Sequence, residues 1–133
     1  MQEQFDELIR NMGKKSPRSE VTRVALSNGS TLIKVTRVDM GLGWNRQESD
    51  VLFVAPPAYP AGAPDCFWVE PSQLRLADGS TPKNTNDSNA IPCDNQAGRQ
   101  TTWFSWHVQA WNPSTDTLSD YYQLILDRLR PAR

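Results

Sequence analysis

Two runs of alternating residues meet at a tight turn in VTRVALSNGSTLIKVTRV, residues 21–38. The runs at 21–26 and 31–38 are rich in the β-branched residues that strands favour. Asn28-Gly29 lies between them, and this pair suits the tight turn that joins two antiparallel strands. The segment therefore predicts a β-hairpin.

Two further strands are expected after the hairpin. A polar, glycine-bearing connection at residues 40–50 leads to an apolar run at 51–54. A proline-rich corner at 56–64 separates this run from a short strand at 66–69, which Pro71 ends. Proline donates no ladder hydrogen bond, so it belongs at strand ends and corners. The pattern predicts an antiparallel four-stranded meander.

Helical patterns flank the strands. An apolar stripe at i, i+3, i+4 and i+7 predicts a helix over residues 2–12, with Gly13 expected to stop it. A second apolar face predicts a helix over 117–129, for which Ser114, Thr115 and Asp116 are candidate N-caps. Residues 72–102 lose periodicity and are expected to form a long irregular loop. The fold class is α+β, in a single domain over 1–133.

Composition excludes several classes of function. The chain has 133 residues, 38% of them hydrophobic, and a net charge of -1, which disfavours nucleic acid as a partner. Its apolar runs are far shorter than the roughly 20 residues that cross a membrane, and it begins with no signal-peptide pattern, so a cytoplasmic protein is expected. One histidine and two cysteines without metal-site spacing predict no metal, and no phosphate loop predicts no nucleotide cofactor.

Ser105 and His107 are the strongest candidates for chemistry. Residues i and i+2 of an extended segment point the same way, so the hydroxyl and the imidazole could share one face. A serine hydroxyl needs a nearby base to act as a nucleophile, and His107 carries the one imidazole of the sequence. The alternative is that both side chains brace the loop among Trp103, Trp106 and Trp111. Both interpretations stay open.

Cys93 and Asp116 are further candidates. A thiol needs no dedicated base, because a fraction of it is ionised at neutral pH. Cys93 lies in the irregular stretch, however, where an incidental surface cysteine is the alternative. Asp116 precedes the last helix, and its alternative role is to cap that helix. Cys66 falls in a predicted strand and is expected to be buried.

Several motifs resemble those of the ubiquitin-conjugating (UBC-like) enzymes. PPAYPAGAPDCF at residues 56–67 is similar to the Tyr-Pro corner after that family's third strand, and WNPS at 111–114 is similar to its Trp-x-Pro element. A more specific similarity is to the prokaryotic branch known as family E. It is carried by Pro56 to Pro60, Phe67-Trp68, Leu76 with Gly79, Trp103 to His107, Trp111 to Pro113, and Asp116 with Leu118.

This resemblance implies a UBC-like fold that lacks the last two helices of the usual family. It implies three partners from bacterial ubiquitin-like modification operons, including those of antiphage defence: an activating enzyme, a ubiquitin-like protein and a JAB-type peptidase. Two departures concern the active site. The family's His-Pro-Asn tripeptide is absent, and Trp103 occupies the position of its nucleophilic cysteine. Asparagines that could replace the missing amide are Asn84, Asn86, Asn89 and Asn95.

Three hypotheses follow. The first is a conjugating enzyme that accepts an activated modifier from the activating enzyme and transfers it to a target through an oxyester on Ser105. The second is a non-catalytic UBC-like module that docks the activating enzyme or the ubiquitin-like protein. The third is a serine hydrolase that uses Ser105 and His107, although the sequence contains no Gly-x-Ser-x-Gly elbow.

Overall fold

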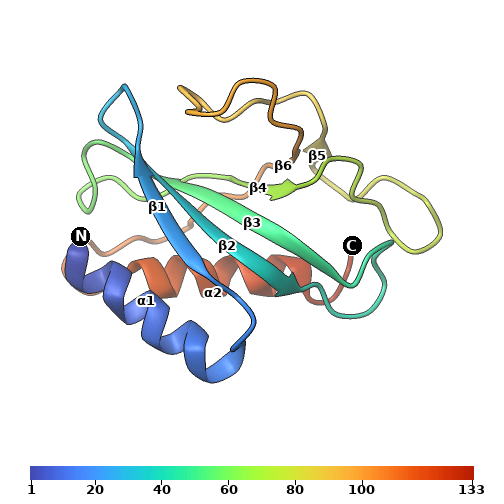
Figure 1. Ribbon diagram of the computed structural model, residues 1–133, viewed down its shortest axis with the longest axis horizontal. Coiled ribbons are helices and arrows are strands. Elements are labelled where there is room, and N and C mark those ends of the chain that lie inside the picture. The colour runs from blue at the N-terminus through green and yellow to red at the C-terminus, as the bar shows by residue number, and fades with distance from the viewer.

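The computed structural model describes residues 1–14 and 16–133, together with the backbone of residue 15. Figure 1 shows a twisted antiparallel sheet with two helices, α1 (Gln2–Lys15) and α2 (Leu118–Leu129), beneath one face and a long loop over the other. The α+β class and the order of helix, strands, loop and helix are confirmed. No helix in the described part of the chain is both long and apolar enough to cross a membrane.

The sheet has six strands in the order β1-β2-β3-β4-β6-β5, so the prediction of four strands is wrong. The strands are β1 (Val21–Ala25), β2 (Thr31–Asp39), β3 (Glu48–Ala55), β4 (Phe67–Glu70), β5 (Thr85–Asn86) and β6 (Thr102–Phe104). The two additional strands are β5 and β6. Each is too short to show the alternation by which a strand is recognised in a sequence.

The main core lies between the helices and one face of the sheet. Phe5, Leu8 and Met12 of α1 are buried there against alternate residues of the central strands. Gly13 does not end α1 as predicted, because the helix continues to Lys15. An interior glycine costs a helix only about 1 kcal/mol, and the buried apolar face offsets that cost.

The irregular segment covers the other face of the sheet. Ile91 packs there against a second buried cluster that includes Leu52 and Trp68, and the Trp68 indole N–H donates to the Asn89 carbonyl at 2.8 Å. Farther along, the nearly buried Arg99 side chain pairs with Asp94 at 2.8 Å and with Glu70 at 3.3 Å. A long, largely irregular segment is present, but the prediction of a loop over 72–102 is wrong in part, because β5 interrupts the segment and β6 begins at Thr102. Apolar contacts and ion pairs fix the segment to the sheet.

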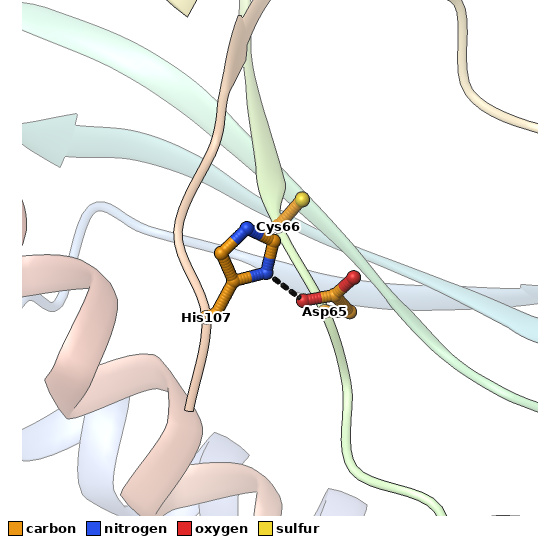
Figure 2. Close-up of side chains that lie close together, drawn as sticks. All are labelled: Asp65, Cys66 and His107. Carbon is orange, nitrogen blue, oxygen red and sulfur yellow. Dashed lines mark hydrogen bonds and ion pairs between the residues drawn. The ribbon is translucent and has the colours of Figure 1, made fainter. Parts of the chain in front are cut away.

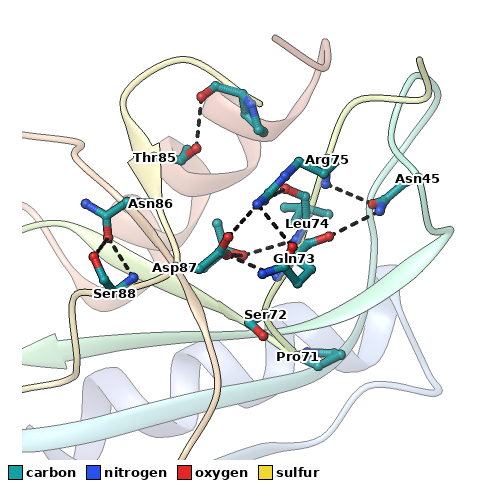
Figure 3. Close-up of polar contacts among 12 residues, drawn as sticks. Asn45, Pro71, Ser72, Gln73, Leu74, Arg75, Thr85, Asn86, Asp87 and Ser88 are labelled. Atoms are coloured by element: carbon teal, nitrogen blue, oxygen red, sulfur yellow. Dashed lines mark hydrogen bonds and ion pairs between the residues drawn. The ribbon is translucent and has the colours of Figure 1, made fainter. Parts of the chain in front are cut away.

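A polar network anchored on Asp87 holds the start of this loop against β6, and Figure 3 shows its contacts with Gln73 and Arg75. The carboxylate accepts hydrogen bonds from Arg75 at 2.5 Å and from the Gln73 backbone N–H at 3.0 Å. It also accepts from the hydroxyl of Thr102 at 2.6 Å. Burial alone would raise the pKa of Asp87, but these hydrogen bonds outweigh it and hold the pKa below its ordinary value.

Asp87→Asn is expected to destabilise the protein by about 1–3 kcal/mol near neutral pH, because an amide replaces an oxygen that accepts from Arg75. A lowered folded-state pKa means that the carboxylate stabilises the fold above its unfolded pKa, and that this contribution is lost as the pH falls through the folded pKa. The Tm difference between the wild type and the variant should therefore shrink between about pH 5 and about pH 2. A constant difference over that range would contradict this account.

Candidate functional site

The candidate site forms where β4 begins beside the end of β6. Phe67 of β4 pairs with Phe104 of β6, and the Cys66 backbone N–H donates to the Trp106 carbonyl at 2.8 Å. The ladder thus continues one step beyond the two strands. As a result, the end of the proline-rich corner lies directly beside residues 105–107.

Three side chains at this place form a continuous hydrogen-bonded series. Ser105 Oγ lies 3.3 Å from His107 Nε2, and His107 Nδ1 lies 2.6 Å from Asp65 Oδ1. Figure 2 shows the contact between the imidazole and Asp65. The Asp65 carboxylate next to Nδ1 favours the imidazole tautomer that is protonated on Nδ1. In this tautomer the lone pair of Nε2 faces the serine hydroxyl. This is the arrangement in which a histidine can take a proton from a serine.

The series is open to solvent. The side chains of His107 and Asp65 are 57% and 65% exposed, and Ser105 is half-buried. A large reactant such as a folded protein can therefore approach the hydroxyl without a lid having to open. The same exposure screens the attraction between Asp65 and a protonated imidazole, so the carboxylate contributes more to orientation than to charge.

Cys66 lies beside this series and is buried, as predicted. Its sulfur, a carboxylate oxygen of Asp65 and a ring nitrogen of His107 all lie within 4.8 Å of one another. The hydroxyl of Tyr121, on α2, donates to the Cys66 carbonyl at 2.7 Å and fixes the backbone here. Burial raises the pKa of the Cys66 thiol, which disfavours the nucleophilic thiolate.

A surface cavity of about 360 Å³ adjoins the site. Asp65 and Cys66 line it together with the apolar side chains of Trp68, Trp103 and Pro57. Trp68, Val54 and Trp103 belong to or pack on the second buried cluster, so the cavity lies on the face of the sheet opposite the helices. Cys66 is therefore a buried residue that borders a surface cavity.

The other candidates from the sequence lie apart from this series. Cys93 is exposed, and among the described residues it is not part of the group formed by Asp65, Cys66 and His107. Asp116 accepts a hydrogen bond from the Asn112 backbone N–H at 2.8 Å and so closes the turn before α2.

The capping role considered for Asp116 is wrong, because the N-cap of α2 is Thr117. The Thr117 hydroxyl accepts from the Asp120 backbone N–H at 3.3 Å, and the Asp120 carboxylate accepts from the Thr117 backbone N–H at 2.8 Å. This reciprocal pair satisfies the helix start one residue later than predicted. A catalytic role for Asp116 stays a prediction.

Asn84 is the asparagine that strand pairing places opposite Ser105. Its carbonyl accepts from the Ser105 backbone N–H at 2.9 Å, one step beyond the pairing of Thr85 with Phe104. The Asn86 side chain instead closes its own turn through the backbone N–H of Ser88 at 3.0 Å. Asn89 lines the cavity that Asp65 and Cys66 also line. A role for any asparagine amide at this site stays a prediction.

Sequence reasoning missed Asp65, the third member of the series. Asp65 and His107 are 42 positions apart, and only the pairing of β4 with β6 brings them together. Asp65 lies in a loop, at the end of the proline-rich corner and next to a strand. This position is the signal that could have identified Asp65 from the sequence, since catalytic and binding residues often lie on loops.

One comparison with known proteins found a family that covers this part of the chain. The family model described as prokaryotic E2 family E matches residues 17–132, a range that contains the whole candidate site. No curated protein and no solved structure matches the chain significantly. An E2-like family indicates ubiquitin-like conjugation and, in general, an activating enzyme and a ubiquitin-like protein as partners. Since the match covers most of the chain, this protein belongs to prokaryotic E2 family E.

Proposed function

We propose that this protein is a ubiquitin-like-protein conjugating enzyme that carries its modifier as an oxyester on Ser105. The observation that carries the proposal is the hydrogen-bonded series from Ser105 through His107 to Asp65. A serine hydroxyl becomes a useful nucleophile when an oriented base can take its proton, and this series supplies both the base and the group that orients it.

In the first step, His107 Nε2 takes the proton of Ser105 Oγ while the oxygen attacks the activated C-terminal carbonyl carbon of the modifier. The bond to the leaving group of the activating enzyme breaks, and the leaving group departs with the electron pair and receives the proton from His107. In the second step, an acceptor amine attacks the ester carbonyl. His107 takes the amine proton and returns it to Ser105 Oγ as the ester bond breaks.

Burial and position favour Ser105 over the two cysteines. Cys66 is buried, and burial raises the pKa of its thiol and disfavours the nucleophilic thiolate, whereas Ser105 is half-buried and in contact with the base. Cys93 is exposed but lies outside the hydrogen-bonded series, so no neighbouring base is assigned to it. The JAB-type peptidase partner and the role in antiphage defence stay predictions.

Intact-mass measurement after incubation with the activating enzyme, the modifier and ATP tests the proposal. We expect an adduct that survives an excess of a reducing thiol and is removed by hydroxylamine, because thiols cleave thioesters much faster than oxyesters. Ser105→Cys should convert this adduct into one that the thiol cleaves. The matched control is Cys93→Ser, whose adduct should keep the wild-type behaviour.

Each other outcome points to a different function. A wild-type adduct that the reducing thiol cleaves would assign the carrier to a cysteine and contradict the proposal. No adduct, with the modifier or the activating enzyme still bound, would favour the non-catalytic module. Turnover of small esters without any conjugate would favour the hydrolase.

A further inference from the structure

Asp65, Cys66 and His107 bring three kinds of metal ligand to one place (Figure 2). A carboxylate oxygen, a thiol sulfur and a ring nitrogen lie within 4.8 Å of one another. Sites with three protein ligands from this set and one open position are typical of Zn²⁺. The sequence predicts no metal, because its one histidine and two cysteines lack metal-site spacing, and only the pairing of β4 with β6 brings His107 beside Asp65 and Cys66.

The three donors need only a small movement to surround an ion. Bonds of about 2.0–2.3 Å to a tetrahedral Zn²⁺ place ligand atoms about 3.5 Å apart. The Cys66 backbone is held by Tyr121 and Trp106, so the main chain that carries the sulfur stays in place. Asp65 and His107 are more than half exposed and can rotate toward it.

An ion can also reach the sulfur. Asp65 and Cys66 both line the surface cavity of about 360 Å³, which is open to solvent. The thiol is the softest donor of the group, and soft thiolate ligands select Zn²⁺ and similar cations over Mg²⁺ or Ca²⁺. The ion expected here is therefore a thiophilic divalent cation.

We propose that Asp65, Cys66 and His107 form a binding site for Zn²⁺ and that zinc at this site stops acyl transfer. The second clause rests on the proposed function of Ser105 and His107. On binding, the Cys66 thiol loses its proton to solvent and the sulfur binds as thiolate, with no change of oxidation state. A neutral imidazole has one nitrogen lone pair, and the ion occupies it.

The loss of that lone pair accounts for the inhibition. If zinc binds Nε2, the base that faces Ser105 is occupied. If zinc binds Nδ1, the ring proton moves to Nε2 and points at the Ser105 hydroxyl, which then has no acceptor for its own proton. In either geometry Ser105 has no base. Zinc binding and acyl transfer therefore compete for the same imidazole, that of His107.

Titration of the full chain with Co²⁺ tests the site independently of any activity. Binding through Cys66 should produce the near-ultraviolet charge-transfer absorption of a cobalt–thiolate bond, and added Zn²⁺ should remove it by displacing the cobalt. Cys66→Ser should abolish the band, and the matched control Cys93→Ser should retain it. No band in the wild type, or a band that depends on Cys93, overturns the proposal.

A second variant tests the site in case Cys66→Ser, which replaces a buried side chain, fails to fold. His107→Gln changes an exposed side chain, so the fold should be kept, and it should weaken cobalt binding by at least about tenfold. A circular dichroism spectrum of the wild-type shape would show that the fold is intact. Unchanged affinity in a folded His107→Gln variant would remove the histidine from the site and overturn the proposal.

Adduct formation with and without Zn²⁺ tests the inhibition. We expect zinc to suppress the wild-type and Cys93→Ser adducts, while in Cys66→Ser the ratio of adduct with zinc to adduct without zinc should return toward one. If zinc still suppresses the adduct in Cys66→Ser, then zinc acts on the activating enzyme instead, and the proposal that zinc at this site stops acyl transfer is overturned. A Cys66-dependent cobalt band without any wild-type adduct would instead contradict the function proposed for Ser105 and leave the zinc site standing.

Discussion

Ser105→Ala is expected to abolish the covalent adduct with the modifier, because the methyl group cannot form an ester. The reaction mixture of activating enzyme, modifier and ATP is analysed by intact mass, and the variant should remain at the mass of the free chain. Ser114→Ala is the matched control: Ser114 is an exposed serine in the turn before α2, and its loss should leave the adduct at the wild-type level. An adduct on Ser105→Ala at the wild-type level would contradict the assignment of Ser105.

His107→Gln should slow adduct formation by about 10²–10⁴-fold, the usual contribution of a general base. Asp65→Asn should slow it less, since Asp65 is 65% exposed and water can replace part of its hydrogen bond to the imidazole. Because Asp65 acts through His107, the double variant should react no more slowly than His107→Gln alone. Rate losses that multiply in the double variant would show that Asp65 acts on the reaction by a separate route.

Signals that lie within a short segment predicted the matching parts of the structure. The hairpin of β1 and β2 follows from Asn28-Gly29 between two alternating runs, and the pairing joins Ala25 to Thr31 across that turn. The contact of Ser105 with His107 is local in the same sense, because it depends only on an extended backbone over three residues. Such features need no knowledge of the rest of the chain.

Features that depend on distant pairing could not be predicted in this way. β5 forms because Thr85 and Asn86 lie beside β6, and the Asp87 network holds them there; neither residue has a strand pattern of its own. Asp65 joins His107 only because β4 and β6 are neighbours in the sheet, although β5 lies between them in the sequence. Asp65 was therefore not predicted from the sequence, because its contact with His107 depends on the order of the strands in the sheet.

Phe104→Ala is expected to cost about 3–5 kcal/mol of folding free energy, the usual range for removing a fully buried phenylalanine. The ring is stacked on Phe67 with a centroid distance of 4.5 Å and meets Trp44 edge-on at 6.3 Å. It also lies 4.9 Å from the guanidinium carbon of Arg128, a buried side chain whose Nη1 has no hydrogen-bond partner among the described residues. The ring therefore supports both the packing of β4 on β6 and a buried charge.

Two effects of the resulting cavity oppose each other. The lost packing and the lost cation–π contact destabilise the fold, but water that enters the space can hydrogen-bond the free Nη1 of Arg128 and recover part of the cost. We expect the packing loss to dominate, with a Tm lower by about 10–20 °C in a thermal melt. Phe104→Leu, which keeps most of the volume but not the aromatic ring, should lose clearly less. Equal losses in the two variants would show that support of Arg128, rather than volume, is the larger contribution of Phe104.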